Sequence, residues 1–507
     1  MLGKIKVNQS LIGIEYGDKQ FIKLAMKGLA SQVIDEDIVE FEQSQGVGLV
    51  TNIVSRRPQP FIGKVTKVTS KFIYINLPLH SPFSSFSHPN YWKTAVKPEM
   101  KMVGWISLET FEVLGFHENL KDLVKSFYQE IQKIDISDIS LNQINSKKSN
   151  PKDLTHLSTF HIDPSGCVDI DDFMSLDRTQ NKIYIHIIDI THYLNLNEKE
   201  DLEERKYGYT WYFPDFAFHL HSLNSIFHSK DIFCITLEID FSEIQIQPKI
   251  YSSKINCKYD FTYNQVQEII DGKINHPIKE DLIWSLDKVQ LPKSSPYRRK
   301  YWKIRNQKLY PEFEQESLAH RYVSAWMIYY NSWIAEHFSV PQRFHPETKL
   351  YQLEKLNELP MEVQYIIYVK QMRQAEYKSE SGHFGLEKKF YTHSTSPLRR
   401  YFDRLIQYIL MGQLMLCPDN LLEHLNRMER LSEKVRDWYD KQLTIQYIQE
   451  NSEKLWESYV VKKVAQGIEI YIYEIQEFIF MKGNTNFEMG DKIQIKLYVE
   501  NQQIIGL

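Results

Sequence analysis

The sequence contains few cysteines, and they stand far apart. Cys167, Cys234, Cys257 and Cys417 form neither a CxxC pair nor a disulfide framework, which argues against a disulfide-stapled fold. No uninterrupted apolar run approaches the ~20 residues that span a bilayer, and the first residues lack the apolar core of a secretory signal. These absences predict a cytoplasmic protein in a reducing compartment, with no membrane partner.

An excess of basic residues is also missing. The chain has 61 lysines and arginines against 65 aspartates and glutamates, which gives a net charge of −4. A protein of this charge does not coat nucleic acid through bulk electrostatics, so such a partner would have to bind in a local channel. Composition is that of an ordinary globular protein, and 507 residues exceed the ~250–300 residues of a single core, so several domains are expected.

The most unusual stretch of the chain is acidic and stands beside β-prone residues. Four carboxylates, Asp163, Asp169, Asp171 and Asp172, fall within ten residues around a Pro-Ser-Gly turn. Crowded like charges next to a buried strand take up protons unless a cation is bound. Carboxylate oxygens are the ligands that Mg²⁺ and Mn²⁺ prefer. The stretch therefore predicts a divalent metal site.

Two other interpretations compete for the same stretch. An acidic surface turn explains many short acidic clusters. A calcium loop of the EF-hand type requires glycine at its sixth position, where Val168 stands instead, so this order is not met. If residues 169–172 continue a strand, Asp169 and Asp171 point to one face and Asp172 to the other.

Several downstream blocks follow in order: residues 186–193 (HIIDITHY), 212–215 (YFPD), 383–386 (HFGL) and 391–401 (YTHSTSPLRRY). Together with the acidic stretch, which reads Asp, five residues, then Asp-x-Asp-Asp, they resemble the ribonuclease II (RNB) family of exoribonucleases. The resemblance covers residues 154–413 firmly and both flanks loosely. It implies a magnesium-dependent, hydrolytic 3′→5′ exoribonuclease that degrades single-stranded RNA to nucleoside 5′-monophosphates. We expect the protein to be a monomer.

The resemblance also implies roles for single residues. It assigns Asp163, Asp169, Asp171 and Asp172 to metal ligation, directly or through water. Arg399 matches the arginine that faces the reacting phosphate, where a guanidinium offers a planar fork to two oxygens. Tyr212 matches a tyrosine that stacks on the terminal base, although a core position is an equal alternative. Arg400 is expected either to pair with an acidic residue of the fold or to contact the RNA.

One departure from the family pattern keeps a rival function open. The family usually carries an acidic pair in a helix where Ser324 and Ala325 stand here, while Asn331, Arg343 and His345 match. An RNA-binding pseudoenzyme with the RNB fold and little or no turnover is therefore the alternative hypothesis. The four aspartates and Arg399 argue against it.

The chain is expected to be a multidomain α+β protein, with a central α/β catalytic domain flanked by small OB-type β-barrels. We predict a cold-shock-like barrel region at residues 1–107 and a helix and linker at residues 108–153. The catalytic domain with its C-terminal helices should cover residues 154–452, and a C-terminal RNA-binding barrel residues 453–507. Apolar spacing predicts helices over residues 318–337, 361–377 and 420–452. A basic, aromatic run at residues 293–305 suggests a solvated helix face, with guidance of RNA as the alternative.

Overall fold

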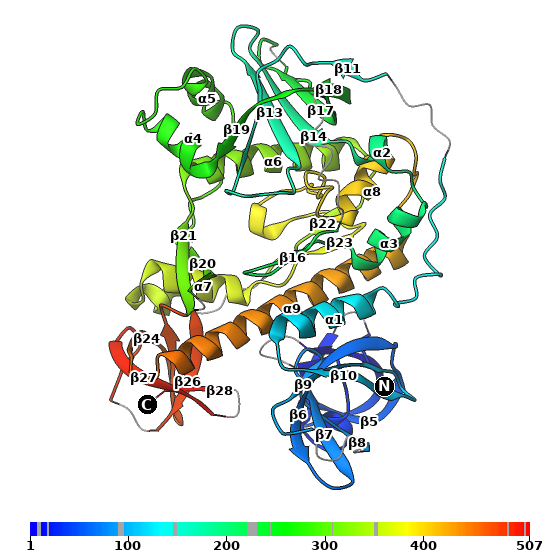
Figure 1. The fold of residues 1–507 in the computed structure, drawn as a ribbon, viewed down its shortest axis with the longest axis vertical. Coiled ribbons are helices and arrows are strands. Elements are labelled where there is room, and N and C mark those ends of the chain that lie inside the picture. Colours follow the sequence, from blue (N-terminus) through cyan, green and yellow to red (C-terminus); the bar gives the residue numbers. More distant parts are fainter. Residues whose placement is uncertain are drawn as a thin grey trace. The chain divides into compact units, whose positions relative to one another are not determined.

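The computed structural model describes residues 1–7, 12–17, 20–89, 96–144, 150–220, 231–243, 245–306, 308–348, 353–483, 486–500 and 503–506, and its fold is drawn in Figure 1. It forms two compact units, residues 1–138 with 431–439, and residues 139–430 with 440–507. Residues 145–149 of the predicted linker lie outside the described ranges. Within those ranges, no helix is long and apolar enough to cross a membrane.

The first unit begins with a closed five-stranded barrel. Its strands pair in the order β1-β2-β3-β5-β4, and alternate residues such as Ile5, Ile14, Val39 and Phe41 turn inward to form the core. The strands are β1 (Leu2–Val7), β2 (Ile12–Tyr16), β3 (Gln20–Leu24), β4 (Ile38–Ser44) and β5 (Val47–Ser55), with the short helix η1 (Gly28–Ser31) between β3 and β4.

A second five-stranded sheet completes this unit, in the order β10-β9-β6-β7-β8. It consists of β6 (Gln59–Val68), β7 (Phe72–Leu77), β8 (Ser81–Pro89), β9 (Lys101–Ile106) and β10 (Phe111–His117). Helix α1 (Leu120–Ile131) follows, begins at the capping residue Asn119, and buries Leu123, Val124, Phe127 and Ile131. The prediction of small β-barrels in the N-terminal region is confirmed.

The second unit is built around a seven-stranded sheet in the order β11-β18-β17-β14-β13-β12-β19. Most neighbours are antiparallel, and only the pairs β11–β18 and β12–β19 are parallel. The strands are β11 (Lys152–Asp153), β12 (Thr159–Asp163), β13 (Asp172–Asp177), β14 (Lys182–Ile188), β17 (Ile232–Asp240), β18 (Lys249–Ile255) and β19 (Cys257–Thr262). Strand β14 is central and almost fully buried, which explains its nearly continuous apolar sequence.

Helices and short hairpins complete the second unit, and the last of these helices also supplies residues 431–439 of the first unit. They are α2 (Ile190–Tyr193), α3 (Lys199–Tyr207), α4 (Tyr263–Ile270), α5 (Lys279–Leu286), α6 (Leu318–His337), η2 (Leu353–Glu358), α7 (Met361–Gln371), η3 (Phe384–Leu386), α8 (Tyr401–Leu410) and α9 (Asp419–Glu450), with the paired strands β15 (Trp211–Tyr212) and β16 (Ala217–Phe218), and β22 (Gln342–Phe344) and β23 (Glu376–Lys378). Helix α6 lies beside the sheet (Figure 1). It has the predicted bounds and starts at a capping box of Ser317 and His320, whereas α7 ends at Gln371, short of its predicted end.

The chain ends in a third five-stranded sheet, in the order β26-β25-β24-β27-β28. Its strands are β24 (Leu455–Val464), β25 (Gly467–Ile472), β26 (Glu477–Lys482), β27 (Lys492–Glu500) and β28 (Gln503–Gly506). Val363 of α7 packs against Val461 and Tyr471 of this sheet. The basic run at residues 293–305 is not a helix: it forms β20 (Arg298–Arg305), paired with β21 (Lys308–Gln315), and Lys300 reaches Asp440 of α9 at 2.9 Å.

Candidate active site

The four aspartates of the acidic stretch lie at the end of β12, at the start of β13 and in the loop between these strands. Strand β12 ends at Asp163, and Gly166 then makes the turn with φ of +77°, a conformation that glycine adopts without strain. Strand β13 begins only at Asp172. The strand alternation expected for Asp169 and Asp171 is therefore not formed, and these carboxylates have different partners.

The carboxylates of Asp163 and Asp172 are close enough for their negative charges to repel each other. Burial and the charge of Asp163 together raise the pKa of Asp172 to about 7, while the charges of Arg399 and His161 oppose the shift. Asp163 Oδ2 is 3.0 Å from Nδ1 of His161. Such a pair of poorly compensated carboxylates is the kind of group that a bound cation stabilises.

Asp171 connects the acidic loop to a turn more than two hundred residues downstream. Its side chain is 4% exposed, and Oδ1 accepts a hydrogen bond from the backbone N–H of Leu398 at 2.7 Å. Its Oδ2 lies 3.4 Å from Nε of Arg399. Burial raises the pKa of Asp171 well above its usual value, although the charge of Arg399 and the Leu398 N–H oppose this.

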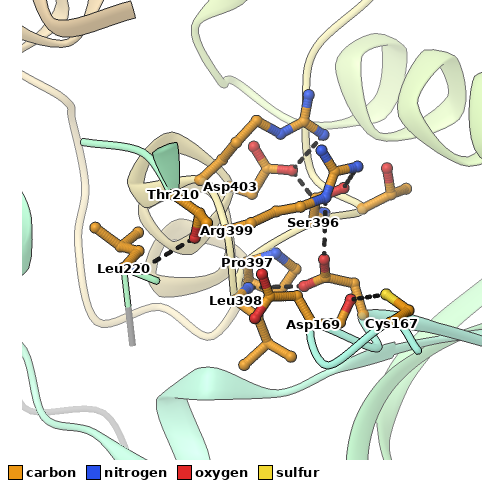
Figure 2. Close-up of polar contacts among 12 residues, drawn as sticks. Cys167, Asp169, Thr210, Leu220, Ser396, Pro397, Leu398, Arg399 and Asp403 are labelled. Carbon is orange, nitrogen blue, oxygen red and sulfur yellow. Dashed lines mark hydrogen bonds and ion pairs between the residues drawn. The ribbon is translucent and has the colours of Figure 1, made fainter. Parts of the chain in front are cut away.

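The turn that carries Arg399 is anchored to the start of helix α8. The N–H of Ser396 donates to Asp403 Oδ2 at 2.7 Å, and Arg404 Nε donates to the carbonyl of Pro397 at 2.7 Å. Arg399 Nη2 donates to Ser396 Oγ at 2.8 Å. Figure 2 shows Ser396, Pro397, Leu398 and Arg399 facing the loop that carries Cys167 and Asp169. The guanidinium is thus held in place while 44% of the side chain stays exposed.

Arg400 and Arg399 have different surroundings. Arg400 Nη2 donates to Asp403 Oδ2 at 2.9 Å, and the Asp403 side chain is fully buried. This is the first of the two roles expected for Arg400, a pairing with an acidic residue of the fold. Its predicted contact with RNA stays a prediction.

Tyr212 comes from the β15–β16 hairpin, which is joined to the same turn. The N–H of Thr210 donates to the carbonyl of Arg399 at 2.9 Å. The Tyr212 hydroxyl donates to Asp169 Oδ2, and 44% of the tyrosine is exposed. Its predicted stacking on a base stays a prediction, but Tyr212 is not the core residue that the alternative required.

Sequence reasoning missed His219, which also contacts Asp169. Its Nδ1 lies 3.1 Å from both carboxylate oxygens, and its ring meets that of Tyr212 edge to face at 6.2 Å between centroids. No local pattern pointed to this residue, since it lies fifty positions from Asp169 and only the hairpin brings it there.

A layer of buried polar contacts lies behind the turn. Arg205 Nη2 donates to Asp201 Oδ2 at 2.6 Å, and the Tyr401 hydroxyl donates to Asp201 Oδ1 at 2.8 Å. Arg343 makes two hydrogen bonds to Glu429, at 2.6 and 2.8 Å. In helix α6, Asn331 Oδ1 accepts from the N–H of Ser394 at 2.9 Å, and Ala325 is buried.

The donor chemistry of the site fits a hard cation. Within the described part of the chain, no three acidic, histidine or cysteine side chains are gathered closely enough to hold an ion by themselves. Mg²⁺ does not need such a cage, because it is usually held by one or two carboxylates together with waters and substrate phosphates. Asp163 and Asp172 offer oxygens of this kind. Burial and the charge of Asp163 raise the pKa of the Cys167 thiol to about 12, which opposes the formation of a thiolate there, and thiolates suit softer cations than Mg²⁺.

Comparison with known proteins places this site in a family. The RNB domain matches residues 151–415. Ribonuclease R of Chlamydia trachomatis is 25% identical over 397 residues, which cover 64% of this chain and 56% of that protein. The chain spans 50–65% of the length of the first curated relatives that it matches.

Solved structures share the fold at low identity. The apo form of Mycoplasma genitalium RNase R matches with a TM-score of 0.74 and 17% identity, covering 100% of both chains, and the same protein has been solved with ribose methylated single-stranded RNA. Yeast Ssd1, a pseudonuclease, matches with a TM-score of 0.70 and 12% identity, over 95% of this chain and 79% of that one. The predicted fold, a central catalytic domain with small β-barrels, is confirmed by this likeness. Because the RNB domain spans just over half of the chain, and includes both the acidic loop and the arginine turn, the chain belongs to the RNB family.

Proposed function

We propose that this protein is a hydrolytic 3′→5′ exoribonuclease that degrades single-stranded RNA to nucleoside 5′-monophosphates with Mg²⁺ or Mn²⁺. The observation that supports this most is the buried contact of Asp171 with both the Leu398 N–H and Arg399. It brings the acidic loop and the arginine turn into one site, as phosphodiester hydrolysis requires. Membership of the RNB family, and relatives named Ribonuclease R, support the same reaction class.

Arg399 is suited to bind the scissile phosphate. Its Nε faces Asp171 and one Nη2 hydrogen is donated to Ser396, so the guanidinium has a fixed plane. A guanidinium has five N–H donors, and those not used by Asp171 and Ser396 remain for phosphate oxygens. A fixed cation of this kind stabilises the negative charge that develops in the transition state without having to reorganise.

Asp163 and Asp172 would hold the divalent cation of the site. When bound, the cation supplies an activated water and neutralises charge on the leaving oxygen. Asp171 holds Arg399 near this pair, because its Oδ1 accepts from the Leu398 N–H and its Oδ2 lies 3.4 Å from Arg399 Nε. Single-stranded RNA is the proposed substrate, bound by a monomer.

A second candidate is an RNA-binding pseudoenzyme. Ala325 is buried in α6 at a position where the family usually carries an acid, and the fold is also similar to that of a pseudonuclease. A protein of this kind would bind RNA at the same surface without turnover.

One assay separates the two candidates. Single-stranded RNA labelled at its 5′ end is incubated with the purified protein and Mg²⁺, and the products are resolved by gel and chromatography. The exonuclease proposal expects progressive shortening from the 3′ end, release of nucleoside 5′-monophosphates, and no shortening in EDTA. Bound but intact RNA in Mg²⁺ and in Mn²⁺ would favour the pseudoenzyme, and internal cuts would contradict both.

A further inference from the structure

A line of buried polar side chains, which we call the polar row, crosses the seven-stranded sheet. Five neighbouring strands, β12, β13, β14, β17 and β18, each contribute one residue, and Figure 1 shows the last four of these strands side by side. The residues are Thr159, Ser175, His186, Thr236 and Ser253, and none is more than 1% exposed. Burying a polar group costs free energy unless it finds a partner, so the row needs a complete set of hydrogen bonds.

Each member of the polar row contacts the next. Thr159 Oγ1 lies 2.7 Å from Ser175 Oγ, which lies 2.9 Å from Nε2 of His186. On the other side of the ring, His186 Nδ1 lies 2.7 Å from Thr236 Oγ1, which lies 2.5 Å from Ser253 Oγ. His186 therefore joins the two halves of the row through its two ring nitrogens.

The chemistry of these groups determines the direction in which the row donates. Ser253 Oγ donates to the backbone carbonyl of Cys234 at 3.5 Å. A hydroxyl has one hydrogen, so Ser253 accepts from Thr236, and Thr236 accepts from Nδ1 of His186. Burial lowers the pKa of His186 to about 3, so the ring is neutral at pH 7 and its Nε2 accepts from Ser175.

The opposite direction would leave the row incomplete. It would end at the hydroxyl of Thr159, whose side chain makes no hydrogen bond other than that with Ser175 within the described ranges. That hydroxyl is fully buried and would be a donor without an acceptor, which costs more than an unused lone pair. The row is therefore satisfied in one direction, with the ring hydrogen of His186 on Nδ1.

The polar row ends at the two strands that hold the proposed metal ligands. Strand β12 ends at Asp163, and β13 begins at Asp172. Among the described residues these strands have only two registered pairs, and one of them is Thr159 with Ser175, whose hydroxyls are bonded. Register is strongly specified only where enough contacts hold it. The hydroxyl pair therefore helps to set the spacing of Asp163 and Asp172.

We propose that His186, with its hydrogen on Nδ1, is a positioning residue: through Ser175 and Thr159 it fixes the spacing of the two aspartates that would hold the cation. The inference rests on the proposed function, in which this pair binds the metal. Two substitutions divide the row at His186. The amide of glutamine reaches the place of Nε2 and can keep the bond to Ser175, whereas the shorter amide of asparagine reaches only the place of Nδ1 and can keep the bond to Thr236.

The first experiment determines the tautomer of His186 in the full chain at pH 7. Long-range correlation of ring protons with nitrogen, in protein labelled with ¹⁵N-histidine, distinguishes the Nδ1–H form from the Nε2–H form. The signal of His186 is the one that is absent from His186→Gln. We expect the Nδ1–H form, and an Nε2–H form or a protonated ring would overturn the direction of the row and with it the proposal.

The second experiment measures hydrogen exchange of the β12 and β13 amides by mass spectrometry, without metal or RNA. Exchange should be about tenfold faster in Ser175→Ala and in His186→Asn, because a buried partner is left unpaired. His186→Gln should stay within twofold of the parent. Ser175→Ala, which removes only a hydroxyl, tests the proposal even if His186→Asn does not fold.

Ser285→Ala is the matched control for this exchange. It removes another fully buried serine hydroxyl, bonded to Tyr322 at 2.7 Å, but from helix α5. The β12 and β13 amides should exchange in it as in the parent. Equal exchange in Ser175→Ala and the control, or in the two His186 variants, would overturn the proposal.

The third experiment measures the effect on the metal site. Binding of Mn²⁺ is followed by paramagnetic resonance of the free ion, and the Mg²⁺ concentration for half-maximal RNA shortening is measured in parallel. Ser175→Ala should bind Mn²⁺ about tenfold more weakly and need correspondingly more Mg²⁺, whereas Ser285→Ala should equal the parent. Unchanged Mn²⁺ binding in Ser175→Ala, or a parent that binds no Mn²⁺, would overturn the positioning role. If Mn²⁺ binding weakens as expected but the parent shortens no RNA, the exonuclease function is refuted and the positioning role is not.

Discussion

Replacing Asp403 by alanine should destabilise the second unit and, at the same time, remove the anchor of the turn that carries Arg399. Asp403 is fully buried, and its Oδ2 accepts from both the N–H of Ser396 and the guanidinium of Arg400. The substitution removes both acceptor contacts. It also leaves the Arg400 guanidinium, whose side chain is only 16% exposed, without its carboxylate.

The size of the effect follows from this burial. Removing one partner of a buried ion pair costs about 3–5 kcal/mol, because the remaining charge stays desolvated. Asp403→Asn should cost less, since the amide oxygen can still accept from Ser396. The double variant Asp403→Asn with Arg400→Gln should recover part of the loss, because no unpaired charge then remains. Burial raises the pKa of Asp403, and the charge of Arg400 opposes this shift.

The assay is urea denaturation of the full chain, monitored by tryptophan fluorescence, with RNA shortening measured in parallel. Asp281→Ala is the control. Asp281 pairs with Arg178 at 3.2 Å, and the two side chains are 33% and 51% exposed, so its loss should cost no more than about 1 kcal/mol. If Asp403→Ala is as stable as this control, or if the double variant is less stable than Asp403→Asn, the buried pair does not anchor the turn.

Three further outcomes are expected. Asp171→Asn should abolish RNA shortening while anisotropy shows retained binding, because the amide keeps the shape and loses the charge; turnover equal to the parent would remove Asp171 from the site. Arg399→Lys should lose nearly as much activity as Arg399→Ala, because a point charge cannot face Asp171, Ser396 and a phosphate at once; a lysine variant with most of the activity would reduce Arg399 to a general cation. Burial lowers the pKa of His186 to about 3, so between pH 6.5 and pH 3 the unfolded state binds a proton that the folded state does not. The free energy of unfolding should therefore be unaffected by His186 above pH 6.5 and about 2 kcal/mol lower at pH 5. Urea titrations at pH 7 and pH 5 should show this loss in the parent and a smaller one in His186→Gln.

Periodic elements were predictable because their pattern is local. Helix α6 has its predicted bounds, and α9 differs from prediction by one or two residues at each end. The barrels were predictable from short alternating strands. The basic run at residues 293–305 was misjudged, because the cationic residues that suggested a solvated helix alternate on β20, where Lys300 points to Asp440 and Arg298 to Tyr473.

The candidate site was predictable only in part. The four aspartates stand out because their charges crowd one loop, and the arginine turn stands out through its family resemblance. The contact between Asp171 and Leu398 joins residues 227 positions apart, and no spacing rule predicts such a contact. The start of β13 at Asp172 depends on the pairing with β14, and His219 enters the site only through the register of a short hairpin.

The buried ion pairs behind the turn that carries Arg399 should respond to ionic strength differently from the contacts with RNA. Both side chains of the Asp201–Arg205 pair are 1% exposed, and the Asp403 carboxylate that pairs with Arg400 is fully buried. Added salt therefore screens these ion pairs little. Contacts between exposed cations and an RNA backbone weaken steeply as salt rises, because bound RNA releases its counterions. For the proposed exoribonuclease, raising the salt concentration should therefore increase KM while leaving kcat nearly constant, because RNA binding weakens well before the turn that carries Arg399 is disturbed.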